Sequence, residues 1–155
     1  MRYLIGIGTY MAMDDSIGLR VAEAISAGGL DHGFRAIEMG GNLVDLIHYL
    51  EADTERVLIV DSANMGSAPG EFAFFTPQQV VTRKAEAGIS THEGDLLKVL
   101  ELAEALGQPL PPVMILGVQP GDMNGEVGLS PELTAWFDEY VRAAVEYMTR
   151  EDPQD

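Results

Sequence analysis

The apolar run VLIV, residues 57–60, constrains the fold of this chain more than any other segment. Consecutive aliphatic residues that end abruptly at Asp61 are typical of a strand buried on both faces of a sheet. We therefore expect a central strand here. Further strands are predicted at residues 3–7 (YLIGI), 34–39 (FRAIEM), 71–75 (EFAFF) and 113–118 (VMILGV).

Helical patterns alternate with these strands. Apolar residues recur at helical spacing from residue 15 to 25, and Gly28-Gly29 end that pattern. Apolar residues recur in the same way over residues 43–50. Two longer helices are predicted at 90–106, which opens on the capping-box sequence STHE, and at 131–149. The alternation predicts an α/β fold: a three-layer sandwich whose twisted sheet has about five strands and carries helices on both faces.

One strand is expected to break the parallel pattern. The segment SANMGSAPG, residues 62–70, joins the central strand to the strand at 71–75. A parallel crossover needs about a dozen residues or more. We therefore expect the strand at 71–75 to run antiparallel to its neighbour in a mostly parallel sheet. Because no repeat or linker interrupts the pattern, residues 1–150 are predicted to form a single domain, followed by a polar tail at 151–155.

The charge of the chain limits its partners. Only 9 Lys and Arg stand against 25 Asp and Glu, which gives a formal net charge of −16. Such a surface repels nucleic acid and anionic lipid, so neither is an expected partner. The absence of cysteine excludes disulfides and thiolate chemistry. The first apolar run is too short for a signal sequence or a membrane-spanning helix, so we expect a cytoplasmic protein.

Polar side chains follow the predicted strands where ligands bind in open α/β sheets, beyond the carboxyl ends of the strands. Asp14 and Asp15 follow the first strand, and Asp61 ends the central one. His92 opens the helix that precedes the last strand. An Asp/Asp/His set suits a divalent ion such as zinc, nickel or manganese.

Each of these residues also has a purely structural interpretation. Asp14 or Asp15 fits a cap of the first helix, and adjacent helical positions diverge, so we do not expect both in one site. Asp61 fits a turn former, and His92 a surface residue of a first helical turn.

Other kinds of site are disfavoured. The sequence GIG at 6–8 lacks the third glycine of a dinucleotide fingerprint, and the Asp pair that follows would repel a pyrophosphate. The chain has no G-x-S-x-G nucleophile elbow, and without cysteine the usual nucleophile sets are mostly excluded.

In their order and spacing, several blocks of the chain are similar to one protein family. The chain resembles the hydrogenase maturation proteases, endopeptidases that remove the C-terminal extension of the nickel–iron hydrogenase large subunit. The resemblance covers nearly the whole length. It rests on GIGTYMAMDDSIGLRVAE (6–23), GG (40–41), LIVDSANMGSAPGE (58–71), STHEGDL (90–96), ILGVQP (115–120) and GLSPEL (128–133).

The resemblance implies a function for the polar residues. Asp15, Asp61 and His92 match the family's nickel-recognising positions, so they are expected to be both metal ligands and catalytic residues of an aspartic-type peptidase. Asp14 is left as a structural residue that holds the loop or caps the helix. The nickel would arrive with the substrate, a [NiFe] hydrogenase large-subunit precursor, and would not be held tightly by the free enzyme. Water would be activated either by the metal or by Asp15 or Asp61 as general base.

Two positions depart from the family pattern. Thr9 stands where the family usually has Asn, which puts a turn or substrate contact of that amide in doubt. Met39 stands where many members have Asp, with Glu38 one residue earlier. Because successive strand residues point to opposite faces, Glu38 can replace that Asp only if the register shifts.

Two rival functions remain open on the sequence. The missing Asp at position 39 favours a binding module that senses the nickel-loaded precursor without cleaving it. A generic α/β metallopeptidase would instead hold its own zinc ion. For the peptidase we expect a monomer or a weak oligomer.

Overall fold

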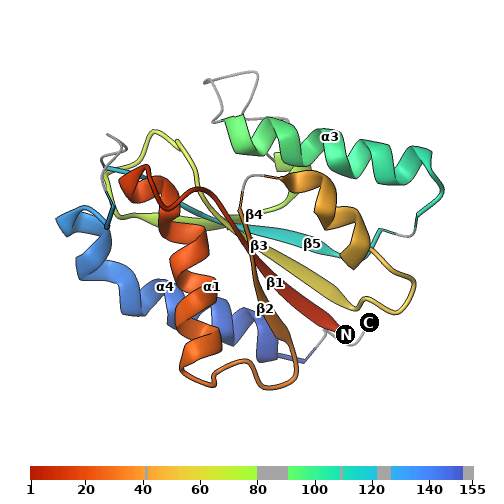
Figure 1. The fold of residues 1–155 in the computed structure, drawn as a ribbon, viewed down its shortest axis with the longest axis horizontal. Helices are drawn as coiled ribbons and strands as arrows, with labels where there is room; N and C mark the ends of the chain where they lie inside the picture. Colours follow the sequence, from red (N-terminus) through yellow and green to blue (C-terminus); the bar gives the residue numbers. More distant parts are fainter. Residues whose placement is uncertain (41, 80–90, 109, 122–126, 152–155) are drawn as a thin grey trace.

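The computed structural model describes residues 1–40, 42–79, 91–108, 110–121 and 127–151, with only the backbone for residues 91–95. Its centre is a five-stranded sheet in the order β2-β1-β3-β5-β4 (Figure 1). The strands are β1 Arg2–Ile7, β2 Arg35–Gly40, β3 Arg56–Ser62, β4 Phe72–Phe75 and β5 Val113–Val118. All five predicted strands are therefore confirmed.

The central position of β3 accounts for its composition. Every residue of β3 is buried, and the strand pairs in parallel with β1 on one side and β5 on the other. The edge strand β4 pairs antiparallel with β5, as predicted from the short connector. β4 is not next to β3, however, because β5 lies between the two strands.

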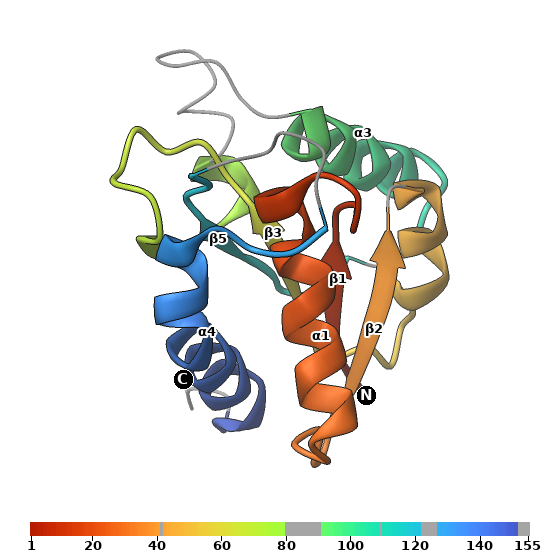
Figure 2. The ribbon, with the colours of Figure 1, turned by 60° about the vertical axis from the view of Figure 1, so that its left-hand side comes forward.

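Helices cover both faces of the sheet, as expected for a three-layer sandwich (Figures 1 and 2). One face carries α1 and α4, and the other carries α3 and the short helix η2. The α-helices are α1 Ile17–Ala27, α3 Thr91–Ala105 and α4 Pro131–Thr149; the 3₁₀ helices are η1 Met13–Ser16 and η2 Leu43–Tyr49. Within the described ranges, no helix combines the length and the apolar character that crossing a membrane requires.

Two helices differ in kind from the prediction. The first begins with a 3₁₀ turn, η1, before α1. The segment at 43–50 forms the 3₁₀ helix η2, which ends with an i→i−3 hydrogen bond from the Leu50 N–H to the Ile47 carbonyl. Its apolar side chains at Leu43, Leu46 and Leu50 are nevertheless buried against α3 and the sheet. The apolar spacing predicted the buried face correctly, but it does not distinguish one helical hydrogen-bond pattern from another over so short a segment.

The sheet divides the core into two apolar clusters. Leu58 and Val60 belong to the cluster under α1 and α4, whereas Val57 and Ile59 belong to the cluster under α3 and η2. Burial on both faces removes the alternation of polar and apolar residues that a half-exposed strand would show, which explains the VLIV run.

Two glycines let α1 lie directly on the sheet. A Cβ atom added to Gly6 of β1 would stand 2.1 Å from the Gly18 carbonyl oxygen, and one added to Gly18 would stand 2.1 Å from the Val60 carbonyl oxygen. No side chain fits at either position. The first glycine of the GIG sequence therefore serves helix–sheet packing.

Two arginines from the sheet hold the C-terminal end of α4. Arg56, only 4% exposed, donates to the Tyr147 carbonyl at 2.5 Å, and its guanidinium lies 5.0 Å from the centre of the Tyr147 ring. Arg2 donates to the carbonyls of Met148 at 3.0 Å and Arg150 at 2.7 Å. The last carbonyls of a helix have no partners within it, so these cations satisfy the end of α4 and favour its dipole.

Candidate active site

The expected site lies at the carboxyl ends of β1 and β3, the edge at which α3 also begins (Figures 1 and 2). The chain leaves β1 at Gly8, whose φ of +138° favours glycine. A Cβ atom there would stand 2.0 Å from the Asp15 carbonyl oxygen. That same oxygen accepts a hydrogen bond from the Thr9 N–H at 3.3 Å. The loop after β1 thus folds back closely over η1, which carries both aspartates.

Asp15 and Asp61 meet at Ser62. The Ser62 hydroxyl donates to Asp15 Oδ1 at 2.9 Å, and the Ser62 backbone N–H donates to Asp61 Oδ1 at 2.8 Å. The two aspartates are 4% and 1% exposed, respectively. The structure therefore brings together two of the three predicted site residues as buried carboxylates that share one serine.

The two carboxylates come from different faces of the sheet. Ile59 packs in the cluster on the α3 side, and side chains alternate along a strand, so Asp61 is directed toward the α3 side. Ser62 is directed toward the α1 side, where it contacts Asp15. The third expected ligand, His92, is the second residue of α3, and its side chain lies outside the described part of the structure. Among the side chains that are described, no group of three or more His, Asp or Glu residues is arranged to hold a metal ion.

Asp14 has a different role from Asp15. It is fully buried, and its carboxylate accepts 2.7 Å hydrogen bonds from the Gly121 N–H, the Ser130 N–H and the Ser130 hydroxyl. Ser130 is the N-cap of α4. The expectation that Asp14 holds a loop is confirmed. The alternative that an aspartate caps α1 is wrong, since the N-cap of α1 is Ser16 and makes no side-chain capping bond.

Asp14 also acts on a nearby tyrosine. Tyr140 of α4 is buried and donates its hydroxyl to the Gly70 carbonyl at 2.6 Å. Burial and, to a lesser degree, the negative charge of Asp14 raise the pKa of Tyr140 to about 12. The phenol therefore stays protonated and keeps its hydrogen bond throughout the physiological range of pH.

The register of β2 does shift beside Met39, the residue that differs from the family pattern. Gly6 pairs with Glu38 but Ile7 pairs with Gly40, so Met39 is an extra residue in β2. The Met39 side chain packs in the apolar cluster on the α3 side. Glu38 accepts a hydrogen bond from the hydroxyl of Tyr10. The Glu38 carboxylate is therefore hydrogen-bonded to Tyr10, and the shift does not bring a carboxylate to the position of Met39.

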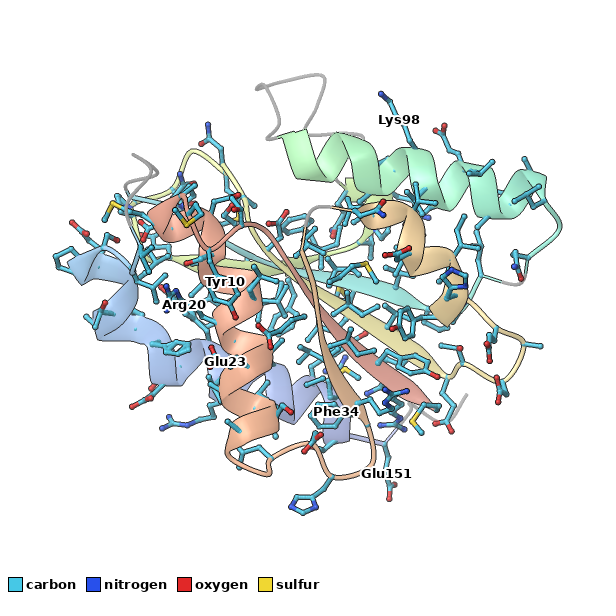
Figure 3. The ribbon with its side chains drawn as sticks, viewed as in Figure 1. Tyr10, Arg20, Glu23, Phe34, Lys98 and Glu151 are labelled. Carbon is cyan, nitrogen blue, oxygen red and sulfur yellow. The ribbon has the colours of Figure 1, made fainter. Side chains whose placement is uncertain are left out.

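Tyr10 joins Glu38 to α1. Its hydroxyl lies 3.5 Å from a carboxylate oxygen of Glu23, and the Arg20 guanidinium lies 5.3 Å from the centre of its ring (Figure 3). Burial and the hydrogen bond to Glu38 raise the pKa of Tyr10. The other departing residue, Thr9, uses its hydroxyl oxygen to accept from the Met11 N–H at 3.4 Å, so a local turn contact exists without an amide side chain.

The sequence-based reasoning missed three polar residues at this edge: Ser62, Gln119 and Ser130. The sequence SPEL at 130–133 carries an N-cap signal, since a serine followed by proline and glutamate is typical of a helix start. Nothing in the sequence marks Ser62 or Gln119, because their partners are distant in the chain.

Comparisons with known proteins agree on one family. The family model for hydrogenase maturation protease matches residues 19–147. The chain is 28% identical over 147 residues to the hydrogenase 2 maturation protease of Escherichia coli, covering 89% of this chain and 85% of that one. It is 23% identical to the hydrogenase expression/formation protein HoxM of Azotobacter vinelandii, covering 94% and 70%, respectively.

Solved structures share the fold. The hydrogenase maturating endopeptidase HybD of Escherichia coli superposes with a TM-score of 0.77 at 21% identity, over 92% of this chain and 88% of that one. The [NiFe] hydrogenase maturation protease HybD of Thermococcus kodakarensis gives a TM-score of 0.76 at 22% identity, over 96% and 99%.

Proposed function

This chain belongs to the hydrogenase maturation protease family, and we propose that its substrate is a [NiFe] hydrogenase large-subunit precursor whose nickel is already inserted. Family membership makes it an endopeptidase, which favours cleavage over the non-cleaving binding module. The bond cut would be the one that precedes the C-terminal extension of the precursor. We infer that the reaction takes place in the cytoplasm, where such a precursor is synthesised.

The observation that carries this proposal is the convergence of Asp15 and Asp61 on Ser62. Both carboxylates accept hydrogen bonds from Ser62 and so place oxygen ligands at the carboxyl-terminal edge of the sheet, where open α/β sheets bind their ligands. Carboxylate oxygens, joined by the imidazole that we expect from His92, suit a divalent first-row metal ion. We assign the recognition of the precursor's nickel to Asp15, Asp61 and His92.

The same carboxylates are suited to the hydrolytic step. An aspartate within hydrogen-bond reach of a water molecule can take one proton from it as the oxygen attacks the scissile carbonyl carbon. The C–N bond then breaks, the hydroxyl stays on the carbonyl carbon, and the proton passes to the leaving amine. Ser62 would keep Asp15 in a fixed orientation during this transfer. We assign the proton-accepting role to the Asp15 and Asp61 pair, in keeping with an aspartic-type peptidase.

The charge of the enzyme suits the proposed substrate. A formal net charge of −16 favours association with a basic partner, so we infer that the C-terminal extension of the precursor is basic. The rate of association would then fall as salt is added.

The central test is the variant Asp61→Asn, which keeps the shape of the side chain but removes its charge. Purified precursor, loaded with nickel or free of it, is incubated with each enzyme, and its mass is followed over time. We expect the wild-type chain to shorten only the nickel-loaded precursor and Asp61→Asn to be slower by roughly 100-fold or more. The exposed Asp138 of α4 supplies the matched control Asp138→Asn, which should cleave normally. Unimpaired cleavage by Asp61→Asn would refute the assignment of Asp61.

A further inference from the structure

A single buried side chain organises the loop between β3 and β4. This loop, residues 63–70, begins two positions after Asp61. Gln119 follows β5 directly and is only 8% exposed. Its Oε1 accepts hydrogen bonds from the Met65 N–H at 2.7 Å and the Ser67 N–H at 3.3 Å. Its Nε2 donates to Asn64 Oδ1 at 3.3 Å. Both ends of the amide are therefore engaged with the loop.

The backbone of Gln119 holds the far end of the same loop. Its carbonyl accepts from the Gly70 N–H at 2.9 Å, and its N–H donates to the Glu71 carbonyl at 2.8 Å. The Gly70 carbonyl in turn accepts the hydroxyl of Tyr140. At the near end, the Ala63 N–H donates to the Val118 carbonyl at 2.9 Å. These contacts fix both ends and the middle of the loop to the sheet, so its conformation is set before any partner binds.

The loop is nevertheless open to solvent. Asn64, Gly66, Ala68 and Pro69 are exposed, whereas the residues that precede them in β3 are buried. No residue from 63 to 70 carries a charge, although the whole chain has a formal net charge of −16. An exposed, uncharged and preformed loop beside the site aspartates is suited to contact the main chain and apolar side chains of a peptide.

We propose that residues 64–69 form a substrate-binding loop for the uncharged segment next to the scissile bond, and that Gln119 is the positioning residue of this loop. The inference rests on the proposed function, because it takes the edge with Asp15 and Asp61 as the place of cleavage. Holding the loop in one conformation lowers the entropy lost when the precursor binds. Asp61 itself is fixed by β3 and by the Ser62 N–H, so loosening the loop should weaken substrate binding and leave the chemical step intact.

The test compares two variants of Gln119 with a matched control. Gln119→Ala removes all three side-chain hydrogen bonds to the loop, whereas Gln119→Glu keeps acceptor oxygens for the Met65 and Ser67 N–H groups and loses the donor to Asn64. We expect KM for the nickel-loaded precursor to rise about tenfold in Gln119→Ala, with kcat within about twofold of wild type and Gln119→Glu in between. Gln108→Ala, which lies just after α3, should leave both constants unchanged.

A second readout follows the loop without relying on cleavage. In Gln119→Ala the amides of Met65 and Ser67 should exchange with deuterium faster than in the wild-type chain, while exchange in β3 stays slow. Trp136 is the only tryptophan and lies beside the loop, since a Cβ atom on Gly70 would stand 3.4 Å from its Cδ1. A ¹⁹F label on Trp136 therefore reports loop order and gives the affinity for precursor by titration.

The outcomes separate this inference from the proposed function. A fall in kcat with unchanged KM would overturn it, because Gln119 would then act through Asp61. Unchanged precursor affinity in a folded Gln119→Ala or Gln119→Glu variant would also overturn it. If the wild-type chain failed to cleave the precursor, the proposed function would fall, yet reduced affinity in the Gln119 variants would still support the loop as a binding element.

Discussion

Ser130 donates both its backbone N–H and its hydroxyl to the carboxylate of Asp14, each at 2.7 Å. The two residues are 116 positions apart in the chain. Their contact joins the start of α4 to η1, and so to the segment that carries Asp15. The position of the site therefore depends on an element from the far end of the chain.

Replacing Asp14 should weaken the whole fold. Asp14→Asn keeps the size of the side chain but offers one acceptor oxygen in place of two, so the donors at Gly121 and at the buried Ser130 compete for it. We expect the free energy of unfolding to fall by about 2 kcal/mol. Urea denaturation followed by circular dichroism measures this change, with Asp138→Asn as the exposed control. An unaltered unfolding midpoint for Asp14→Asn would contradict the structural role.

Removing the hydroxyl of Ser62 should affect catalysis more than stability. In Ser62→Ala the carboxylate of Asp15 loses the 2.9 Å hydrogen bond that orients it, while the Ser62 N–H still holds Asp61. We expect kcat for precursor cleavage to fall about tenfold, with a loss of stability of about 1 kcal/mol. The exposed Ser26 provides the control Ser26→Ala. A normal kcat in Ser62→Ala would show that Asp15 needs no such support.

Stability at high pH should depend on Tyr140. Its pKa is raised to about 12 from an ordinary value of 10.0, so the folded state holds its proton more tightly than the unfolded state. The stability that this proton contributes is present below pH 10 and declines as the pH rises from 10 toward 12. Urea midpoints measured across this range should fall more steeply for the wild-type chain than for Tyr140→Phe. Parallel profiles for the two proteins would disprove the shift.

Arg56 of β3, which binds the C-terminal end of α4, should stabilise the fold without affecting catalysis. Arg56→Ala removes the buried donor to the Tyr147 carbonyl and the cation–π contact with the Tyr147 ring, and it leaves Arg2 as the remaining donor to the Arg150 carbonyl. We expect a loss of about 2–3 kcal/mol in unfolding free energy. The exposed pair of Arg142 and Glu139 should matter little, with Arg142→Ala changing stability by less than about 0.5 kcal/mol. Equal losses in both variants would argue against a special role for Arg56.

Much of the fold could be predicted from the sequence, because a strand that is buried on both faces is an uninterrupted run of apolar residues, as in VLIV. The direction of β4 also followed from a length alone, since its connector is too short to cross over in parallel. Its place at the edge did not follow. β5 comes later in the chain and inserts between β3 and β4, and strand order depends on contacts that no local pattern encodes.

The nearness of the two aspartates could be predicted from the sequence, but the contacts that organise them could not. Asp61 lies at the end of β3 and Asp15 lies in η1 after β1, on the edge where ligands bind in such sheets, and that order is visible in the sequence. Ser62 is unremarkable by type, and only the fold shows that its hydroxyl reaches Asp15. For Glu38 only a condition could be set from the sequence, a register shift in β2; that shift is present, but the Glu38 carboxylate accepts a hydrogen bond from Tyr10.

The close contact of Gly6 and Gly18 has a practical meaning for protein engineering. At this contact the backbone of α1 packs directly on the backbone of β1 and β3, so no side chain can change size to accommodate a substitution. The position of α1, and of the aspartates that precede it, is therefore fixed relative to the two strands. A redesign that aims at another precursor should leave Gly6 and Gly18 unchanged. Sequence diversity would be placed in exposed loop residues such as Ala68, whose side chains hold nothing in the loop, because backbone hydrogen bonds of Ala63 and Gly70 attach the ends of the loop to the sheet.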